Sequence, residues 1–278
     1  MRVRFACTSD NVPCGAVRRW IIREGIMKVR IASSALVALC LSVGVATAQK
    51  IPAYITAAVA NPDRPEADTK RDADRKPAES VAFAGIKPGD KVADLIPGRG
   101  YFTKIFSKVV GPKGWVYAYY PSNIDAIYTK NGLTFPVPAN PKYPNVSVIH
   151  APAEKFVAPE KLDVVWTSQN YHDMHDKFFG PADLGAVNKA VYDSLKPGGV
   201  YIVLDHVAEA GSGLRDTDTL HRIDPAVVKK EVEAAGFVFV GESKVLADPS
   251  DDHTKKVFDS SIRGKTDQFI FKFKKPRK

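Results

Sequence analysis

Residues 91–103 read KVADLIPGRGYFT, and this stretch decides the fold. Its first part, 91–95, is a short apolar run of the kind that forms a buried strand. A turn containing Gly98 and Gly100 then leads into residues 101–110, whose apolar side chains recur at helical spacing. A strand, a glycine-containing turn and a helix in this order predict a unit in which backbone can approach a ligand closely.

The same alternation of apolar runs and helical patterns continues along the chain. Further strands are expected at 115–119, 146–150, 162–167, 200–204, 237–240 and 269–273, and helices at 123–130, 181–195 and 225–235. Apolar strands that lack regular polar alternation predict an α/β fold with a mostly parallel sheet covered by helices on both faces. One domain at 79–278 would hold this sheet, preceded by an N-terminal arm and helix at 49–78.

The N-terminus has the features of a targeting segment. A basic stretch beginning at Met27 is followed by an almost entirely apolar run, 31–45, and then by small residues up to Ala48. This order predicts a secretory signal peptide at 27–48, because the apolar run is shorter than the roughly 20 residues of a membrane-spanning helix. We therefore expect 1–26 to be an over-extended start, and the mature protein to be periplasmic or secreted without stable membrane insertion.

Composition narrows the classes of partner. The chain has a formal net charge of +9, but residues 1–48 carry seven of its 40 Lys and Arg and two of its 31 Asp and Glu, which leaves +4. Much of this excess lies in the tail, 272–278, so we expect no nucleic-acid partner. All three cysteines precede residue 49, which excludes thiolate metal sites, cysteine nucleophiles and disulfides from the remainder. The oligomeric state has no signal in the sequence.

The glycine turn is the first candidate ligand site. The helix that follows it offers unpaired N–H groups and partial positive charge. Asp94, at the end of the strand, could accept a ligand ammonium group or orient the loop. The turn is not of the G-x-G-x-x-G dinucleotide form, because Thr103 occupies the place of the third glycine. The alternative interpretation is a plain tight turn with a capping aspartate.

Five segments, taken together, resemble class I S-adenosylmethionine-dependent methyltransferases. They are DLIPGRG at 94–100, which fits the motif D-x-x-x-G-x-G, GWVYA at 114–118, LDVV at 162–165, LKPGGV at 195–200 and AAGF at 234–237. The resemblance implies a Rossmann-like seven-stranded fold with the last strand antiparallel, and S-adenosylmethionine as cofactor. More narrowly, NYHD, LHRID and GKTDQF resemble segments of a group of exported bacterial methyltransferases.

The resemblance also assigns cofactor contacts, with two departures from the family pattern. Tyr120 stands near the place where an acid usually holds the ribose at the end of the second strand. Pro152 stands where an acid usually lies near the adenine, and Glu154 follows two residues later. The expected cofactor-binding residues are Asp94, Gly98, Gly100, Tyr101, Tyr120 and Glu154.

Polar side chains follow the fourth and fifth predicted strands, where open α/β sheets bind ligands. In one interpretation His172 or His206 is a general base that deprotonates an acceptor hydroxyl, since the pKa of histidine lies near neutral pH. Asp173 or Asp205 would then orient the ring. In a second interpretation the His and Asp side chains bind a divalent metal, and in a third they only satisfy loop backbone. The expected catalytic residues are His172, Asn170, Tyr171, Asp173 and His206, with no metal ligand assigned. Of these, His172 is expected to be the base, and Asn170 and Tyr171 to line the methyl-transfer site.

These observations lead to one functional hypothesis and two alternatives. The leading hypothesis is an exported S-adenosylmethionine-dependent methyltransferase that acts on a small molecule. The first alternative is a catalytically inactive ligand-binding protein of the cell envelope on a methyltransferase fold, which the missing acid after the second strand favours. The second is a metal-assisted hydrolase. The methyl acceptor has no signal in the sequence.

Overall fold

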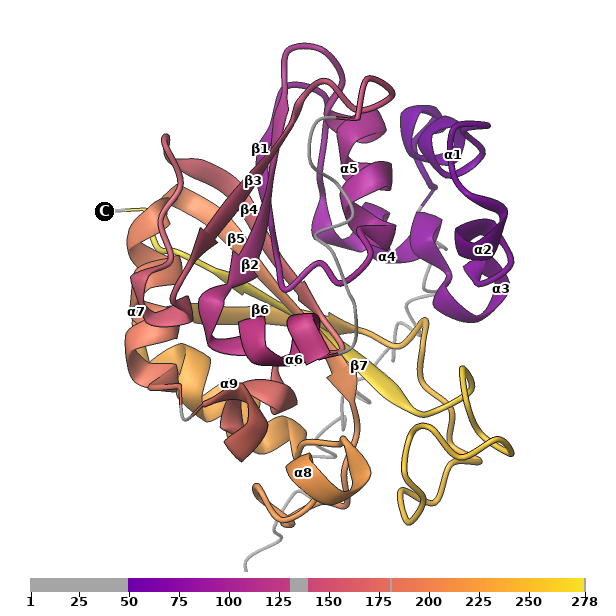
Figure 1. Cartoon of the computed structure of the whole chain (residues 1–278), viewed down its shortest axis with the longest axis vertical. Helices are drawn as coiled ribbons and strands as arrows, with labels where there is room; N and C mark the ends of the chain where they lie inside the picture. Colours follow the sequence, from indigo (N-terminus) through magenta and orange to yellow (C-terminus); the bar gives the residue numbers. More distant parts are fainter. Residues whose placement is uncertain (1–49, 131–139, 181, 278) are drawn as a thin grey trace, which may run out of the picture. The chain divides into compact units, whose positions relative to one another are not determined.

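The computed structural model describes residues 50–130, 140–180 and 182–277. Residues 1–48, with the predicted signal peptide, lie outside the described residues. Within the described part, seven strands form one sheet in the order β3-β2-β1-β4-β5-β7-β6 (Figure 1). The strands are β1 (Lys91–Leu95), β2 (Trp115–Pro121), β3 (Val146–Ala151), β4 (Leu162–Ser168), β5 (Leu195–His206), β6 (Val238–Ser243) and β7 (Gln268–Lys274).

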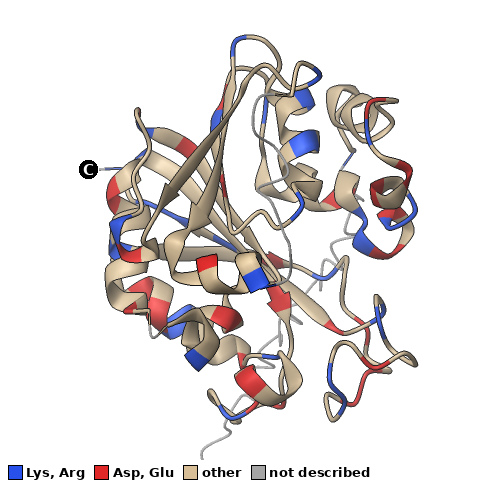
Figure 2. Ribbon diagram, in the orientation of Figure 1, with Lys and Arg blue, Asp and Glu red and all other residues tan. Residues whose placement is uncertain are grey.

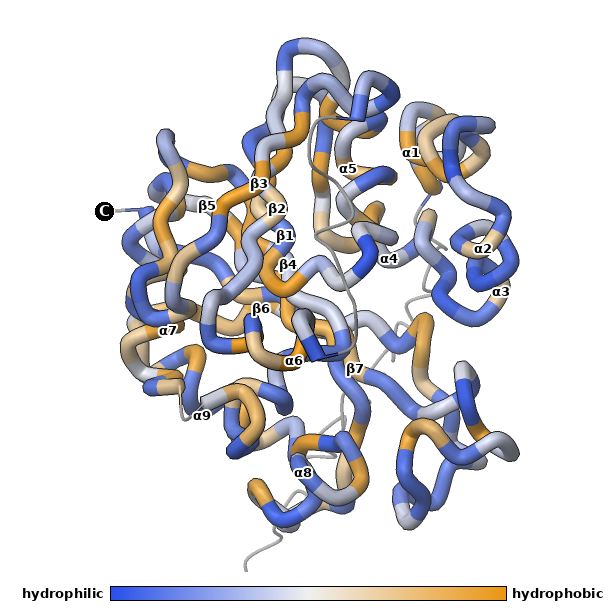
Figure 3. The backbone as a smooth tube through the Cα atoms, in the orientation of Figure 1, coloured by the Kyte–Doolittle hydropathy of each residue, from blue (hydrophilic) through white to orange (hydrophobic). Residues whose placement is uncertain are grey.

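Strand direction agrees with the predicted fold class. Neighbours from β3 through β5 pair in parallel, whereas β7 pairs antiparallel with both β5 and β6. The predicted α/β sheet, mostly parallel with the last strand antiparallel, is therefore confirmed. Figure 3 shows why these strands form the centre, since the apolar stretches of the backbone concentrate there and the hydrophilic ones in the surrounding loops.

Helices cover both faces of the sheet, as predicted. One apolar cluster joins α1 (Ala53–Val59), α4 (Pro77–Ala84) and α5 (Tyr101–Val110) to one face of the strands. A second cluster joins α7 (Leu184–Ser194) and α9 (Pro225–Ala234) to the other face. The shorter helices are α2 (Glu66–Thr69), α3 (Asp72–Arg75), α6 (Asp125–Lys130), α8 (Thr217–Leu220), and the 3-10 turns η1 (Ser122–Ile124), η2 (Ala153–Lys155), η3 (His172–His175) and η4 (Lys177–Phe179).

Alternation along the strands decides which side chains can meet at the sheet edge. Successive strand residues point to opposite faces. Val92 and Trp166 pack on the α5 face, whereas Ala93 and Val165 pack on the α7 face. Even-numbered positions of β1, β4 and β5 thus share the α5 face, and odd-numbered positions share the α7 face.

Several element boundaries differ from the sequence prediction for local reasons. The helix predicted at 181–195 begins at Leu184, because the Asp183 carboxylate caps it by accepting a hydrogen bond from the Ala186 N–H at 3.1 Å. The segment predicted as one helix at 123–130 is a 3-10 turn followed by α6. The fifth strand extends beyond the predicted 200–204 at both ends, to Leu195 and His206.

The N-terminal arm packs against α5 through ion pairs. Lys104 Nζ lies 2.7 Å from Asp68 Oδ2, and both side chains are about nine-tenths buried. Asp72 accepts hydrogen bonds from the Arg64 guanidinium at 2.7 Å and from the Tyr101 hydroxyl at 2.6 Å. These contacts hold α2 and α3 beside the start of α5.

Charges of both signs are interspersed over the helices and loops, and the strands carry few of them (Figure 2). In the described part of the chain, no helix has the length and apolar character that crossing a bilayer requires.

Candidate functional site

A cavity of about 750 Å³ lies where β1, β4 and β5 end and β7 begins. The strand ends supply its floor, the arm supplies one side, and the long loop before β7 supplies another. The residues that line it are Ala67, Asp68, Arg71, Asp74, Arg75, Asp94, Ile96, Pro97, Gly98, Arg99, Tyr101, Phe102, Ser168, Gln169, Asn170, His206, Val257, Phe258, Arg263, Gly264 and Gln268. Asp94, Ser168 and His206 are the even-numbered strand-end positions that alternation places on the α5 face.

The glycine turn bends by left-handed backbone. Ile96, Gly98 and Gly100 have φ values of 59°, 55° and 71°. Two side chains from other segments hold the turn by hydrogen bonds. Asn170 Nδ2 donates to the Ile96 carbonyl at 2.9 Å, and the Tyr120 hydroxyl donates to the Gly98 carbonyl at 3.1 Å. A Cβ added to Gly98 would meet no heavy atom within 4 Å, so the chain leaves open space beside this glycine.

Asp94 is a buried carboxyl group on the cavity wall. Its side chain is 3% exposed, and the Thr103 hydroxyl donates to Oδ2 at 2.6 Å. Burial raises the pKa of Asp94 to about 7, although the Thr103 hydrogen bond acts in the opposite direction. The carboxyl group is therefore poised near neutral pH, and a cationic ligand group beside it would favour the ionised form. Thr103, in the place of a third glycine, thus holds the Asp94 carboxyl group by this hydrogen bond.

Arg75, from the arm, brings a positive charge to the cavity wall, near enough to Asp94 to favour the ionised form of that carboxyl group. Its guanidinium donates to Gln169 and lies 4.5 Å from the centre of the Tyr101 ring. Burial lowers the pKa of Arg75 to about 10, and Arg71 acts in the same direction. Across the described residues no carboxylate lies within ion-pair distance of Arg75, so this cation is available to an anionic ligand group.

His172 lies in η3, directly after β4, and is 2% exposed. Its Nδ1 lies 2.8 Å from Asp205 Oδ1, and its Nε2 lies 3.1 Å from Asp173 Oδ1. Burial alone would lower the pKa of His172, but the two carboxylates outweigh it and raise the pKa to about 10. The ring does not line the cavity. A histidine that is already protonated cannot accept a proton, so this environment does not suit a general base.

His206 is the histidine that faces the cavity. Its Nδ1 lies 2.7 Å from the Thr266 hydroxyl. Burial lowers the pKa of His206 to about 3 and outweighs the opposing effect of Asp205. The ring is therefore neutral at physiological pH, but a pKa this low makes it a weak proton acceptor, so His206 lines the cavity as a neutral hydrogen-bonding group.

The other predicted site residues divide by position. Asn170, Gly98 and Tyr101 line the cavity with Asp94 and His206. The remainder lie outside its lining. Gly100 is the N-cap residue before α5, and Tyr120 is fully buried beneath the glycine turn. Glu154 is half-buried in η2, and Asp173 pairs with His172. Tyr171 is also fully buried, and its hydroxyl donates to Glu231 at 2.9 Å.

Several cavity residues were not predicted. The arm contributes Arg71 and Arg75. They lie in the charged run 62–75, which is expected to be an arm leading into a short helix, and nothing in the sequence indicates that this run packs on α5. Gln268 belongs to the GKTDQF segment, whose glutamine starts β7. The loop 248–265 reaches the cavity because an ion pair anchors it. The fully buried Arg222 holds Asp251 of this loop, with Nη1 2.9 Å from Asp251 Oδ2.

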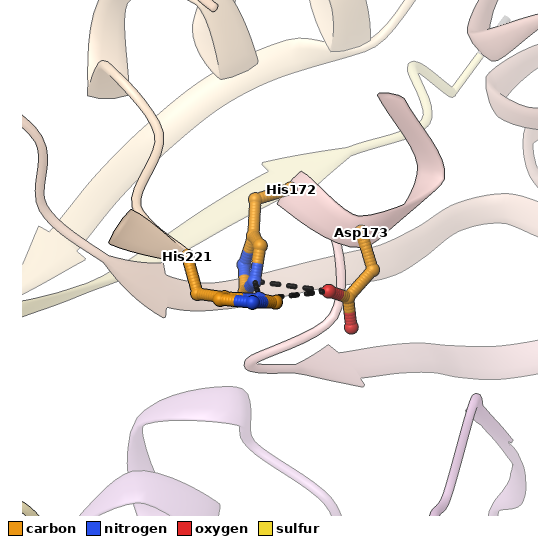
Figure 4. A group of neighbouring side chains, drawn as sticks. All are labelled: His172, Asp173 and His221. Carbon is orange, nitrogen blue, oxygen red and sulfur yellow. Dashed lines mark hydrogen bonds and ion pairs between the residues drawn. The ribbon is translucent and has the colours of Figure 1, made fainter. Parts of the chain in front are cut away.

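Behind His206 lies a group of three possible metal-ligating side chains, His172, Asp173 and His221 (Figure 4). Asp173 receives contacts from both histidines, at 3.1 Å from His172 Nε2 and 3.4 Å from His221 Nδ1. Burial would raise the pKa of Asp173, but hydrogen bonds from the two histidines lower it to about 2. The sequence assigned no metal ligand, because His221 lies 48 residues beyond Asp173 and nothing local connects the two.

Comparison with known proteins agrees with this architecture. No family model matches the chain. It is 32% identical over 127 residues to the ubiquinone/menaquinone biosynthesis C-methyltransferase UbiE of Shewanella oneidensis, and 30% identical over 129 residues to that of Pseudomonas paraeruginosa. Each match covers 45% of this chain, and 46% and 45% of the relatives, so the chain spans less than half of their length.

Among solved structures, the [4+2]-cyclase SpnF has the same fold, with a TM-score of 0.51 and 16% identity over 74% of this chain and 82% of that chain. The protein thus has the Rossmann-like methyltransferase fold. The predicted resemblance to class I methyltransferases is confirmed by the sequence relatives, and the narrower exported group stays a prediction.

Proposed function

We propose that the protein is an S-adenosylmethionine-dependent methyltransferase that acts on a small molecule. The observation that carries this proposal is the open glycine turn beside Asp94, at the wall of a cavity of about 750 Å³. This volume lies within the range of roughly 300–1,000 Å³ that is typical of small-molecule sites. The methyltransferase relatives support the same reaction class.

The charges of the cavity suit the amino-acid end of the cofactor. Asp94 would accept its ammonium group, and Arg75, which has no carboxylate partner in the described part of the chain, would bind its carboxylate. The backbone at Gly98 would let the cofactor approach closely. When bound, S-adenosylmethionine supplies an activated methyl group.

The acceptor would lie between the cofactor and His206. The neutral His206 ring would orient the acceptor by a hydrogen bond, and the proton that the acceptor loses on methylation would pass to water in the cavity, because the pKa of His206 is too low to hold it. Asn170 lies on the same wall and is fixed by its hydrogen bond to the Ile96 carbonyl. Phe102 and Phe258 form an apolar part of the cavity wall, which suits a small molecule with an apolar part. The predicted signal peptide at 27–48 supports a periplasmic or secreted location.

Calorimetric titration of the purified protein with S-adenosylmethionine and S-adenosylhomocysteine tests the proposal. We expect micromolar binding, about −8 kcal/mol. Asp94→Asn should weaken it, whereas Asp193→Asn, at a half-exposed side chain on α7, should not. If the folded protein binds neither compound, the proposal fails and the ligand-binding alternative takes its place. One observation favours that alternative, because neither Tyr120 nor Glu154 lines the cavity.

A further inference from the structure

Three donor atoms from two separate segments meet beside the cavity. His172 Nε2 lies 3.1 Å from Asp173 Oδ1 and 3.3 Å from His221 Nδ1, and the last two atoms are 3.4 Å apart. Figure 4 shows the three side chains pointing toward one another. Two ligands that each lie about 2.05 Å from a tetrahedral metal are about 3.3 Å apart. We infer that His172, Asp173 and His221 bind one divalent first-row transition-metal ion.

Hydrogen bonding can pair both imidazoles with the Asp173 carboxylate, but it leaves two ring nitrogens 3.3 Å apart. The Nδ1 atom of His172 faces Asp205, so Nε2 faces the group and carries at most one hydrogen. If both rings donate to Asp173, His172 Nε2 and His221 Nδ1 are two N–H donors 3.3 Å apart with no hydrogen bond between them. A cation in the centre, in place of the Nε2 proton, contacts all three donors at once.

Asp205 provides an independent argument. Metal-binding histidines nearly always donate their other ring N–H to a carboxylate, carbonyl or water, which fixes the ring. Asp205 is fully buried and lies 2.8 Å from His172 Nδ1. The backbone N–H groups of His172 and His206 also donate to it, at 2.9 and 2.8 Å. The carboxylate is thus rigidly held in the position that directs His172 Nε2 into the group.

His221 is held in place from the other side. It ends α8 with a φ of 55°, a left-handed conformation that is uncommon for a residue with a side chain. Its ring packs against Phe258 at 4.9 Å between centres, and Phe258 also lines the cavity. This left-handed residue ends α8 and places the imidazole beside Asp173.

The donor set determines the class of metal. Two imidazoles and one carboxylate suit zinc and its first-row neighbours, whereas calcium and magnesium prefer oxygen ligands alone. Three protein ligands leave a fourth position for water or for a ligand group. The Asp173 and His221 side chains are 21% and 16% exposed, so the site can be reached from solvent. A bound ion would join the segment after β4 to the loop after β5 at the edge of the cavity.

Titration of the untagged, chelator-treated full chain with Co²⁺ tests this inference directly. We expect one equivalent to bind, with the strong visible absorption of four-coordinate cobalt, and Zn²⁺ to displace it. His221→Ala should remove the absorption, and Asp173→Asn should do so with less risk to folding. Asp205→Asn should weaken binding roughly 10- to 100-fold. The matched control is His150→Ala, because His150 lies on β3 and pairs with Asp125.

Two results would overturn the inference. One is a cobalt spectrum of six-coordinate type or no saturable binding to the folded full chain. The other is retention of the four-coordinate absorption in both His221→Ala and Asp173→Asn. Because the titration contains no S-adenosylmethionine, its outcome is independent of the proposed methyltransferase function.

Discussion

Two buried aspartates mark the carboxyl ends of β1 and β5, and their surroundings differ in kind. Asp94 is 3% exposed, and the Thr103 hydroxyl donates to it. Asp205 is 0% exposed and is matched by a histidine ring and two backbone N–H groups. The first carboxyl group lines a cavity and, among the described residues, has no ion pair within hydrogen-bond distance, although Arg75 and Lys104 lie near enough to favour its charge, and the second is paired inside the protein. Burial at a sheet edge therefore does not distinguish a ligand site from a structural one, whereas the count of donors does.

The pleat explains how the two environments arise so close together. Asp205 and His206 are consecutive residues of β5, so their side chains leave the strand on opposite faces. His206 joins the cavity with Asp94, and Asp205 holds His172 on the other side. The same edge thus carries a ligand-facing set and an internally paired set.

Removal of the Asp205 carboxylate is expected to have the largest effect. Asp205→Ala breaks one of the two ion pairs of the buried His172 imidazolium, leaving only Asp173, and leaves two backbone N–H groups unmatched. This should cost about 3 kcal/mol of unfolding free energy. Urea denaturation followed by circular dichroism measures this loss. Asp94→Asn, at an equally buried carboxyl group, should change stability by about 1 kcal/mol or less. Equal losses in the two variants would remove the distinction between the two aspartates.

Asp94→Asn should instead impair ligand binding. A hydrogen bond to a charged group contributes about 1.5–3 kcal/mol, so affinity for S-adenosylhomocysteine should fall about 10- to 100-fold. Calorimetric titration of the folded variant measures the change, with Asp205→Asn as the counterpart whose carboxyl group does not line the cavity. Unchanged affinity in Asp94→Asn would show that the ammonium group of the ligand lies elsewhere.

The sequence predicted the strand-level architecture well and the site only in part. Residues 91–95 and 101–110 were predicted with the observed boundaries because apolar periodicity and the glycine turn are local signals. His172 was predicted as the base, since a sequence does not show that this side chain meets two carboxylates whereas His206 meets Thr266. Arg75 was missed because its position depends on packing of the arm against α5.

The pH dependence of binding sharpens the contrast further. Burial raises the pKa of Asp94 from 3.8 to about 7, so the group is mostly protonated at pH 6 and mostly ionised at pH 8. A ligand ammonium needs the ionised form, so affinity for S-adenosylhomocysteine should rise about tenfold across this interval. Calorimetry at several pH values measures the slope. Asp94→Asn should flatten it, and a slope that persists in this variant would assign the proton to another group.

The smallest expected effect concerns the turn itself. Gly98 has a φ of 55°, and a Cβ there meets no heavy atom of the protein within 4 Å. Gly98→Ala should therefore lose only about 1 kcal/mol of unfolding free energy, from the left-handed backbone alone. Gly211→Ala is the matched control, because Gly211 also has positive φ, 82°, and open space but does not line the cavity. Both variants should lose similar stability, and only Gly98→Ala should weaken cofactor binding, since the added methyl group projects into space that no protein atom fills. Equal affinities in the two variants would mean that the ligand does not approach this backbone, and the glycine would then serve the turn alone.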